Sequence, residues 1–406
     1  MVRDGFSTPA GLRRGGLWVR VGPAPNAQPR RMTTIIKARD AADFLSLVPR
    51  LLGYEPRRSV VLIPFSAGRT GGGLRVDLPP AAVDTDAVAS TLIGFACRVE
   101  HTDAYAVLVY DEDADAVTHA ELVAALEVRA QACGLRRIDA LHISSGRWRS
   151  YLDPALGGKI AADADAGAHR PAADQGAGAA LPHVDLARSE RVGRALTECA
   201  RALDWVLHGS RPADARIHPD ALVASLALED LPAFFETWIQ PGSAAPPPNG
   251  SGDAEHADVQ DLALLIWCLA RPALRDIALA TWVGGVDGGD AALTAQQEWE
   301  AGAAYPDELG AWMLGEGPRP DVDRLTDALE VCRLAAASAP AVYRPGALAA
   351  SAWLSWALGR STHAARYCEQ ALTIDAEHGL SLIVLSMIDA AHLPDWAFRA
   401  QPGRLT

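Results

Sequence analysis

The sequence predicts an α/β part, built on a mixed sheet with flanking helices, followed by an all-α part. Between residues 33 and 152, short β-branched runs alternate with amphipathic windows of helical spacing, as they do in α/β units. From about residue 185 onwards, helical windows follow one another without a strand signal. The segment between these parts is rich in Ala, Gly and Asp and has no aromatic residue. We therefore expect two folded parts joined by a flexible linker.

The first 31 residues differ from the rest in charge. Residues 1–31 carry six Arg and one Asp, a formal charge of +5. Because the whole chain has a net charge of −13, the remaining residues carry −18. Their apolar stretch is interrupted by charged residues, Gly and Pro, so it does not resemble a signal peptide. We expect residues 1–31 to be a disordered basic tail or the product of a mis-assigned start, with Met32 as the true first residue.

The α/β part, residues 32–152, is expected to form a two- or three-layer sandwich. Asp40 is the expected N-cap of a helix that ends at residue 52, Asp84 caps a helix over 84–100, and a third helix spans 115–133. The expected strands are 33–37, 59–65, 74–78, 104–110, 136–143 and 147–152. The Gly-rich segment 66–73 is expected to be a flexible hairpin loop.

Residues 153–184 are the expected linker, and residues 185–406 form the helical part. Prolines and glycines predict a disordered loop at 241–257. A second Gly-rich segment, 284–290, lacks a preceding strand and the Lys-Ser/Thr of a phosphate loop, so we expect a plain loop. The expected helices are 186–208, 217–228, 232–239, 258–270, 273–283, 290–302, 321–338, 346–358, 361–373 and 377–391.

Composition narrows the function classes. A net charge of −13 disfavours nucleic acid and anionic membrane surfaces as partners. The six cysteines are more than thirty residues apart, a pattern typical of single buried thiols in a reducing compartment. No apolar run is long enough for a membrane span. We expect a cytoplasmic protein without a metal or cofactor, and its oligomeric state stays open.

One helical hairpin near the C-terminus resembles a single tetratricopeptide unit. The residues that carry this resemblance are Ala352, Trp356, Gly359, Ala364, Tyr367 and Ala371. An ordinary helical bundle with Ala at close contacts is the alternative, because no second repeat is present. The hairpin and the nine tryptophans of the helical part predict a surface that binds a protein partner.

No motif predicts a catalytic residue. The acidic run at 111–116 lacks the glycine turn and terminal Glu of a calcium loop, so we expect it to serve as a solvated loop and N-cap. The candidate ligand-binding residues are Arg75, Asp77, Arg147, Arg149, Ser150 and Tyr151. Because alternate side chains of a strand point to the same face, Arg75 shares a face with Asp77, and Arg147 shares a face with Arg149 and Tyr151. If the two strands lie close together, either arginine meets Asp77, in a structural ion pair or as part of an anion site.

Three segments resemble the landmarks of domain-of-unknown-function family 4192, which is found in actinobacteria. They are DFLSLVPRLLGYEPRRSVVLI (43–63), LRVDLP (74–79) and GRWRSYL (146–152), and residues 347–394 resemble the family's helical ending. The resemblance runs from about Met32 to Pro394 and implies an architecture without an established activity. Two functions therefore stay open. One is a non-enzymatic interaction or scaffold protein, and the other is an enzyme or sensor that binds a small anionic ligand near the strand ends.

Overall fold

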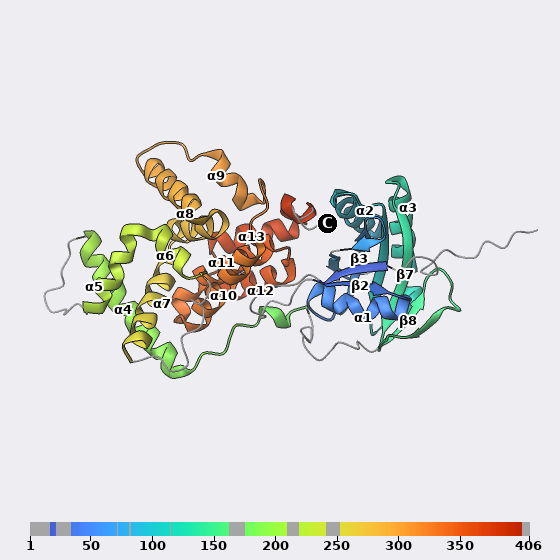
Figure 1. The fold of residues 1–406 in the computed structure, drawn as a ribbon, viewed down its shortest axis with the longest axis horizontal. Helices are drawn as coiled ribbons and strands as arrows, with labels where there is room; N and C mark the ends of the chain where they lie inside the picture. Colours follow the sequence, from blue (N-terminus) through green and yellow to red (C-terminus); the bar gives the residue numbers. More distant parts are fainter. Residues whose placement is uncertain are drawn as a thin grey trace, which may run out of the picture. The chain divides into compact units, whose positions relative to one another are not determined.

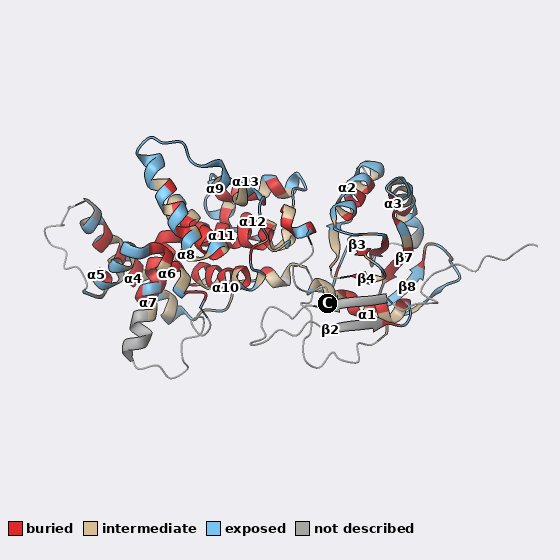
Figure 2. Cartoon of the chain, turned by 45° about the horizontal axis from the view of Figure 1, so that its top comes forward, coloured by how far each residue is buried: buried red, intermediate tan, exposed pale blue. Residues whose placement is uncertain are grey.

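The computed structural model describes residues 17–21, 34–70, 72–80, 83–113, 115–161, 175–208, 219–240 and 252–399. The chain divides into two compact units. The α/β unit comprises residues 1–178 and 398–406, and the helical unit comprises residues 179–397. Each unit has its own buried core (Figure 2).

A six-stranded mixed sheet forms the centre of the α/β unit, in the order β5-β3-β6-β7-β8-β9. The strands are β3 (Ser59–Phe65), β5 (Leu74–Asp77), β6 (Ala104–Tyr110), β7 (Arg136–Ser144), β8 (Arg147–Ser150) and β9 (Gly157–Lys159). Within this sheet β6 and β7 are parallel, and the other neighbouring strands are antiparallel. Every residue of β3 and β6 is buried, as expected for strands that are covered on both faces.

Helices cover both faces of this sheet (Figure 1). Helix α1 (Ala41–Leu52) packs on one face, and α2 (Thr85–Arg98) and α3 (Ala120–Ala132) pack on the other. The α1 side buries Phe44, Leu45, Val48, Val61, Ile63 and Leu108, among others. The opposite side buries Val60, Leu62, Leu92, Ile93, Val107, Val109, Leu122 and Leu126. The predicted mixed α/β sandwich is confirmed in its three-layer form.

The predicted helix ends also agree with the structure. The Asp40 carboxylate accepts a hydrogen bond from the Asp43 amide at 2.9 Å, and Asp84 caps α2 in the same way. Helix α1 ends at Gly53, whose φ of 85° lies in the left-handed region that glycine adopts without strain.

The segment 66–73 connects β3 to its antiparallel neighbour β5, as in the predicted hairpin, and its described part also contains a short strand that the sequence does not predict. Ala67 and Gly68 both have positive φ and form a tight turn, followed by strand β4 (Arg69–Thr70). Strand β4 joins a second sheet of order β2-β1-β4, with β1 (Leu17–Val21) and β2 (Thr34–Ala38). Strand β1 falls within the range 1–31, and the rest of that range lies outside the described residues. Strand β9 and the 3-10 turn η2 (Ala177–Ala179) fall within the expected linker.

The described part of the helical unit contains ten α-helices. They are α4 (Leu186–His208), α5 (Pro219–Ser225), α6 (Leu231–Thr237), α7 (Gly252–Leu269), α8 (Pro272–Glu300), α9 (Asp307–Ala311), α10 (Val322–Ser338), α11 (Arg344–Ala357), α12 (Ser361–Ile374) and α13 (Gly379–Asp389). Four 3-10 turns, η3 (Leu226–Asp230), η4 (Trp312–Leu314), η5 (Ala341–Tyr343) and η6 (Asp395–Phe398), lie between or after them. Helix α11 is buried from Pro345 to Ala357 and contacts α7, α8, α10, α12 and α13, so it is the centre of this unit.

The expected loop at 284–290 is wrong, because α8 continues through it. Gly285 alone has non-helical angles inside α8, with φ 74° and ψ −170°, and it kinks the helix there. A Cβ at Gly288 would lie 3.0 Å from the carbonyl oxygen of Ala280, and one at Gly289 would lie 2.2 Å from Thr281 Oγ1. The glycines therefore permit close packing of the kinked helix, a role that the sequence does not distinguish from a loop. Within the expected loop 241–257, residues 252–257 belong to α7, and 241–251 lie outside the described residues.

The predicted hairpin of α11 and α12 is present, with a positive φ of 74° at Gly359. Ala352, Ala364 and Ala371 are fully buried within it. Its assignment to a tetratricopeptide repeat stays a prediction. Among the described residues, no helix combines the length and the apolar character that a membrane span requires.

Candidate functional site

The candidate site lies where β6 and β7 end, on the sheet face covered by α2 and α3. Because these two strands are parallel, their carboxyl ends lie at one edge of the sheet, where open α/β sheets commonly bind ligands. The acidic segment 111–115 follows β6. At the end of β7 the chain turns into β8 through Ser145 and Gly146, whose φ values of 49° and 69° are typical of a type I′ turn.

The carboxylates of the acidic segment are held by neighbouring groups. Glu112 accepts hydrogen bonds from the Ser145 amide and hydroxyl, both at 2.8 Å. Asp113 lies 3.2 Å from an Arg58 guanidinium nitrogen. Asp115 caps the 3-10 turn η1 (Ala116–His119) by accepting from the amides that follow it. The predicted role as loop and N-cap is therefore confirmed for this part of the segment.

Asp111 and His119 form the most buried polar contact of the site. His119 Nε2 lies 2.8 Å from Asp111 Oδ2, and the Asp113 amide donates to Asp111 Oδ1 at 3.1 Å. Burial acts to raise the pKa of Asp111, but its hydrogen bonds to His119 and the Asp113 amide, together with the nearby Arg58 guanidinium, outweigh burial and hold the pKa below 3.8. Asp111 is thus a buried carboxylate that stays ionised at neutral pH.

Tyr151 and His142 lie beside this pair. Their rings are 6.3 Å apart in an edge-to-face arrangement, and His142 is buried on β7. The Tyr151 hydroxyl is buried and has no hydrogen-bond partner among the described residues. Burial raises the pKa of Tyr151, and the nearby Asp111 and Asp115 raise it further. Tyr151 therefore supplies a neutral hydroxyl that is able to donate or accept a hydrogen bond.

Three cationic side chains share the same sheet face as His142. Arg149 is opposite His142 in the β7–β8 register, and Arg147 is opposite Lys159 in the β8–β9 register. Directly opposed residues of antiparallel strands point to the same face. We call Arg147, Arg149 and Lys159 the basic face. All three are exposed, and none forms an ion pair with a residue that the structure describes.

The other predicted site residues lie elsewhere. Arg75 and Asp77 are on β5, four strand positions from β8, or roughly 19 Å away. The Arg75 guanidinium donates to Asp77 and, at 3.4 Å, to the Arg57 carbonyl, so this ion pair is local to β5. The expected meeting of Asp77 with an arginine of β8 is wrong, because β3, β6 and β7 separate the two strands.

Ser150 has a structural position on the opposite face of β8. Its hydroxyl accepts hydrogen bonds from the amides of Leu152, at 3.1 Å, and Asp153, at 3.4 Å, and so shapes the turn after the strand. Trp148 shares this face and packs against the core on the α1 side. The predicted division of β8 into two faces is confirmed.

Sequence reasoning missed the contributions of His119, His142 and Lys159. His119 is eight residues from Asp111, and the two meet because a turn and the start of a helix fold back over the strand end. Lys159 lies in a segment predicted to be linker. The alternating pattern of β7 predicts which sheet face His142 points to. It does not predict which residues of β8 lie beside His142.

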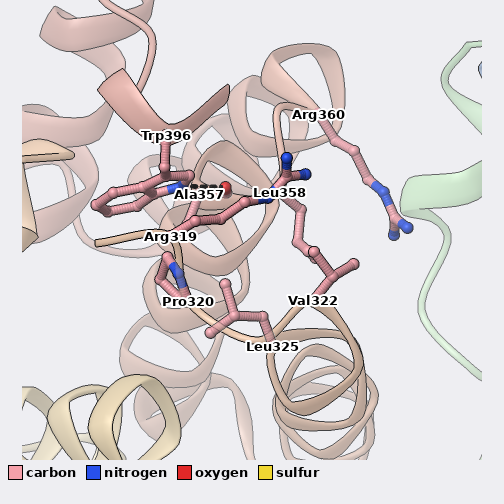
Figure 3. A pocket seen from close by; sticks show the side chains of 8 residues that line it. All are labelled: Arg319, Pro320, Val322, Leu325, Ala357, Leu358, Arg360 and Trp396. Atoms are coloured by element: carbon pink, nitrogen blue, oxygen red, sulfur yellow. Dashed lines mark hydrogen bonds between the residues drawn. The ribbon is translucent and has the colours of Figure 1, made fainter. Parts of the chain in front are cut away.

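The helical unit contains a cavity of about 70 Å3 (Figure 3). Its lining residues are Arg319, Pro320, Val322, Leu325, Ala357, Leu358, Arg360 and Trp396. Trp396 Nε1 donates to the Ala357 carbonyl at 3.0 Å and closes one side. Ligand pockets usually measure about 300 Å3 or more, so this cavity has room only for a few water molecules. It is a packing feature between α10, α11 and η6.

Metal ligands are not gathered in the described part of the chain, where no three His, Cys, Asp or Glu side chains are placed to hold an ion. No curated protein and no solved structure matches the chain. A family model described as "Domain of unknown function (DUF4192)" matches residues 42–395, which include the sheet strands from β3 to β9 and the helical unit. The chain therefore belongs to this family.

Proposed function

We propose that the α/β unit binds a small anionic ligand, one that carries a carboxylate or a phosphate, on the basic face. The observation that carries this proposal is the set of three exposed cations, Arg147, Arg149 and Lys159, without ion-pair partners among the described residues. In a chain with a net charge of −13, cations are expected to be balanced by neighbouring carboxylates. A local excess of positive charge in such a chain supports an anion site.

The surrounding groups restrict the kind of anion. Guanidinium groups bind carboxylates and phosphates through two parallel hydrogen bonds. The acidic segment 111–115 lies at the same edge of the sheet and would repel an extended polyanion. These groups favour a compact ligand over a nucleic acid.

Thermal unfolding in the presence of candidate anions tests this proposal. Inorganic phosphate, citrate and nucleoside phosphates are suitable probes. A ligand present at one hundred times its dissociation constant should stabilise the folded chain by roughly 2.7 kcal/mol. Arg149→Ala should abolish this stabilisation. Arg136→Ala, at the opposite end of β7, removes an exposed arginine of the same unit and should leave it intact.

Two results would count against the anion site. One is the absence of any stabilising anion in the screen. The other is equal loss of binding in both arginine variants, since the effect would then reflect net charge instead of the basic face. Binding should also weaken as the salt concentration rises, because the cations are exposed and their field is screened.

Protein binding through the helical unit is a second candidate function. Six of its nine tryptophans, namely Trp238, Trp267, Trp282, Trp353, Trp356 and Trp396, are buried, so they do not supply the predicted surface. The observation that favours it is α13, where the adjacent Leu382 and Ile383 are 45% and 52% exposed. Leu382→Ser with Ile383→Ser should abolish stoichiometric capture of one specific partner. Exposed Val342→Ser is the control.

A further inference from the structure

We propose that Cys97 and Cys133 are a dithiol that forms a reversible disulfide across the ends of α2 and α3. The sequence places them 36 residues apart, since 133 − 97 = 36, and predicts single buried thiols, but both cysteines are exposed in the structure. The fold brings them together for a topological reason. Helix α2 leads into β6 and α3 leads into β7, and these two strands are parallel neighbours. Both helices therefore end at the same edge of the sheet.

Local contacts fix the two thiols at this edge. Cys97 is the penultimate residue of α2 and Cys133 is the C-cap of α3. The Arg136 amide donates to the Asp103 carbonyl at 3.1 Å, which joins the two chain segments that leave these helices. The two thiols are near enough that Cys133 contributes to a raised pKa of Cys97.

Exposure distinguishes this pair from the other cysteines. Cys97 and Cys133 are exposed, whereas Cys199, Cys268, Cys332 and Cys368 are buried. A buried cysteine serves as a small apolar side chain, and it is protected from reagents in solution. Cys97 and Cys133 do not contribute to the core between α2 and α3, which consists of residues such as Ala96, Leu126 and Ala130. Their thiols are accessible to an oxidant.

The reaction partner is a low-molecular-weight disulfide. Burial and the neighbouring Cys133 raise the pKa of Cys97 to about 11, which disfavours Cys97 as the first nucleophile, and we assign the first attack to Cys133. It forms a bond to one sulfur of the reagent and releases the other half as a thiolate. Cys97 then loses its proton to solvent and attacks the Cys133 sulfur, which releases the second thiolate. Two protein thiols are oxidised, and the reagent is reduced to two thiols.

Mass spectrometry of the full chain tests the proposal. The reduced protein is treated with glutathione disulfide, alkylated and digested with trypsin. We expect the peptides 76–98 and 130–136 to be recovered as one linked species, two hydrogen atoms lighter than their sum. Dithiothreitol should separate them again. In Cys97→Ser, the link should be lost completely and Cys133 should retain one glutathione.

The wild-type chain alone is sufficient to overturn the proposal. Glutathione on both cysteines without the link shows that the thiols do not reach each other. The absence of any modification at either cysteine shows that they are not accessible. Both of these results are measured on the wild-type chain, so they do not depend on whether Cys97→Ser folds.

Discussion

At the scale of single residues, the site depends on contacts between side chains from different elements. Sequence alternation correctly assigns Arg147 and Arg149 to one face of β8, because the strand period is two. It does not show that His119 reaches Asp111. That contact requires the turn after β6 and the direction of η1, both of which depend on tertiary packing. The sequence pattern thus predicts correctly which strand face a side chain is on, but it does not predict which side chain of another element it contacts.

The Asp111–His119 contact predicts a defined pH dependence of stability. Asp111 has a folded-state pKa below 3.8, so the unfolded state binds the proton more readily. The ionised Asp111 contributes its full stabilisation when the pH is above 3.8, the ordinary pKa of an aspartate. This stabilisation is lost as the pH falls through the lower pKa that Asp111 has in the folded state. Asp111→Asn should cost about 1.5–3 kcal/mol at pH 7, and this difference should shrink as the pH falls below about 4. Urea unfolding at each pH measures it.

The neighbouring Asp113 is the matched control. It pairs with Arg58, but their side chains are 75% and 73% exposed, so Asp113→Asn should change stability by less than about 1 kcal/mol. A constant difference between Asp111→Asn and the wild type across the acid range would show that the carboxylate charge is not what stabilises this site.

At the scale of elements, the two glycine-rich segments were predicted with unequal success, since the hairpin connection at 66–73 is present and the loop at 284–290 is not. The sequence predicts a loop at 66–73 and another at 284–290, because glycine is common in loops. In the first, the glycine of the pair Ala67–Gly68 supports a tight turn. In the second, the glycines allow a kinked helix to pack closely. Glycine is compatible with all three roles, and only the neighbouring elements determine which one it has. Helices with capping residues and an apolar stripe, such as α1 and α2, were predicted well.

Two glycines of α8 should respond oppositely to alanine. Gly289→Ala should destabilise the chain by about 1–3 kcal/mol, because the new methyl group would collide with Thr281 and Pro232. Gly284→Ala should be neutral or stabilise by up to about 1 kcal/mol, since the space beside it is open and alanine favours the helix. Chemical denaturation compares them. Equal effects of the two substitutions would exclude close packing as the reason for Gly289.

At the scale of the whole molecule, the sequence predicted two parts of different secondary structure, and the mixed sheet and the helical region agree with it. Charge and composition could not predict where the basic face lies, because it is created by the register of β7, β8 and β9. The tryptophans were interpreted as a binding surface, but most of them fill the core of the helical unit. Large aromatic residues contribute to cores and to interfaces alike, so composition alone does not separate these roles.

The separate cores predict separate unfolding transitions. Leu108 and Leu354 are both fully buried, one in the α/β unit and one in the helical unit. Truncation of either to alanine should cost about 2–5 kcal/mol. In differential scanning calorimetry, Leu108→Ala should lower one transition and Leu354→Ala the other. If both variants shift a single common transition, the two units unfold cooperatively.

The pairing of β3 with β6 has a consequence for how fast the α/β unit folds. This pairing joins residues 59–65 to residues 104–110, so a long loop must close before it forms. Both strands contribute side chains to both cores of the sheet, so neither core is complete until the loop has closed. Loop closure carries an entropy cost before any contact compensates for it. We therefore expect this event to be part of the folding transition state, and the later addition of β8 and β9 to be fast and local.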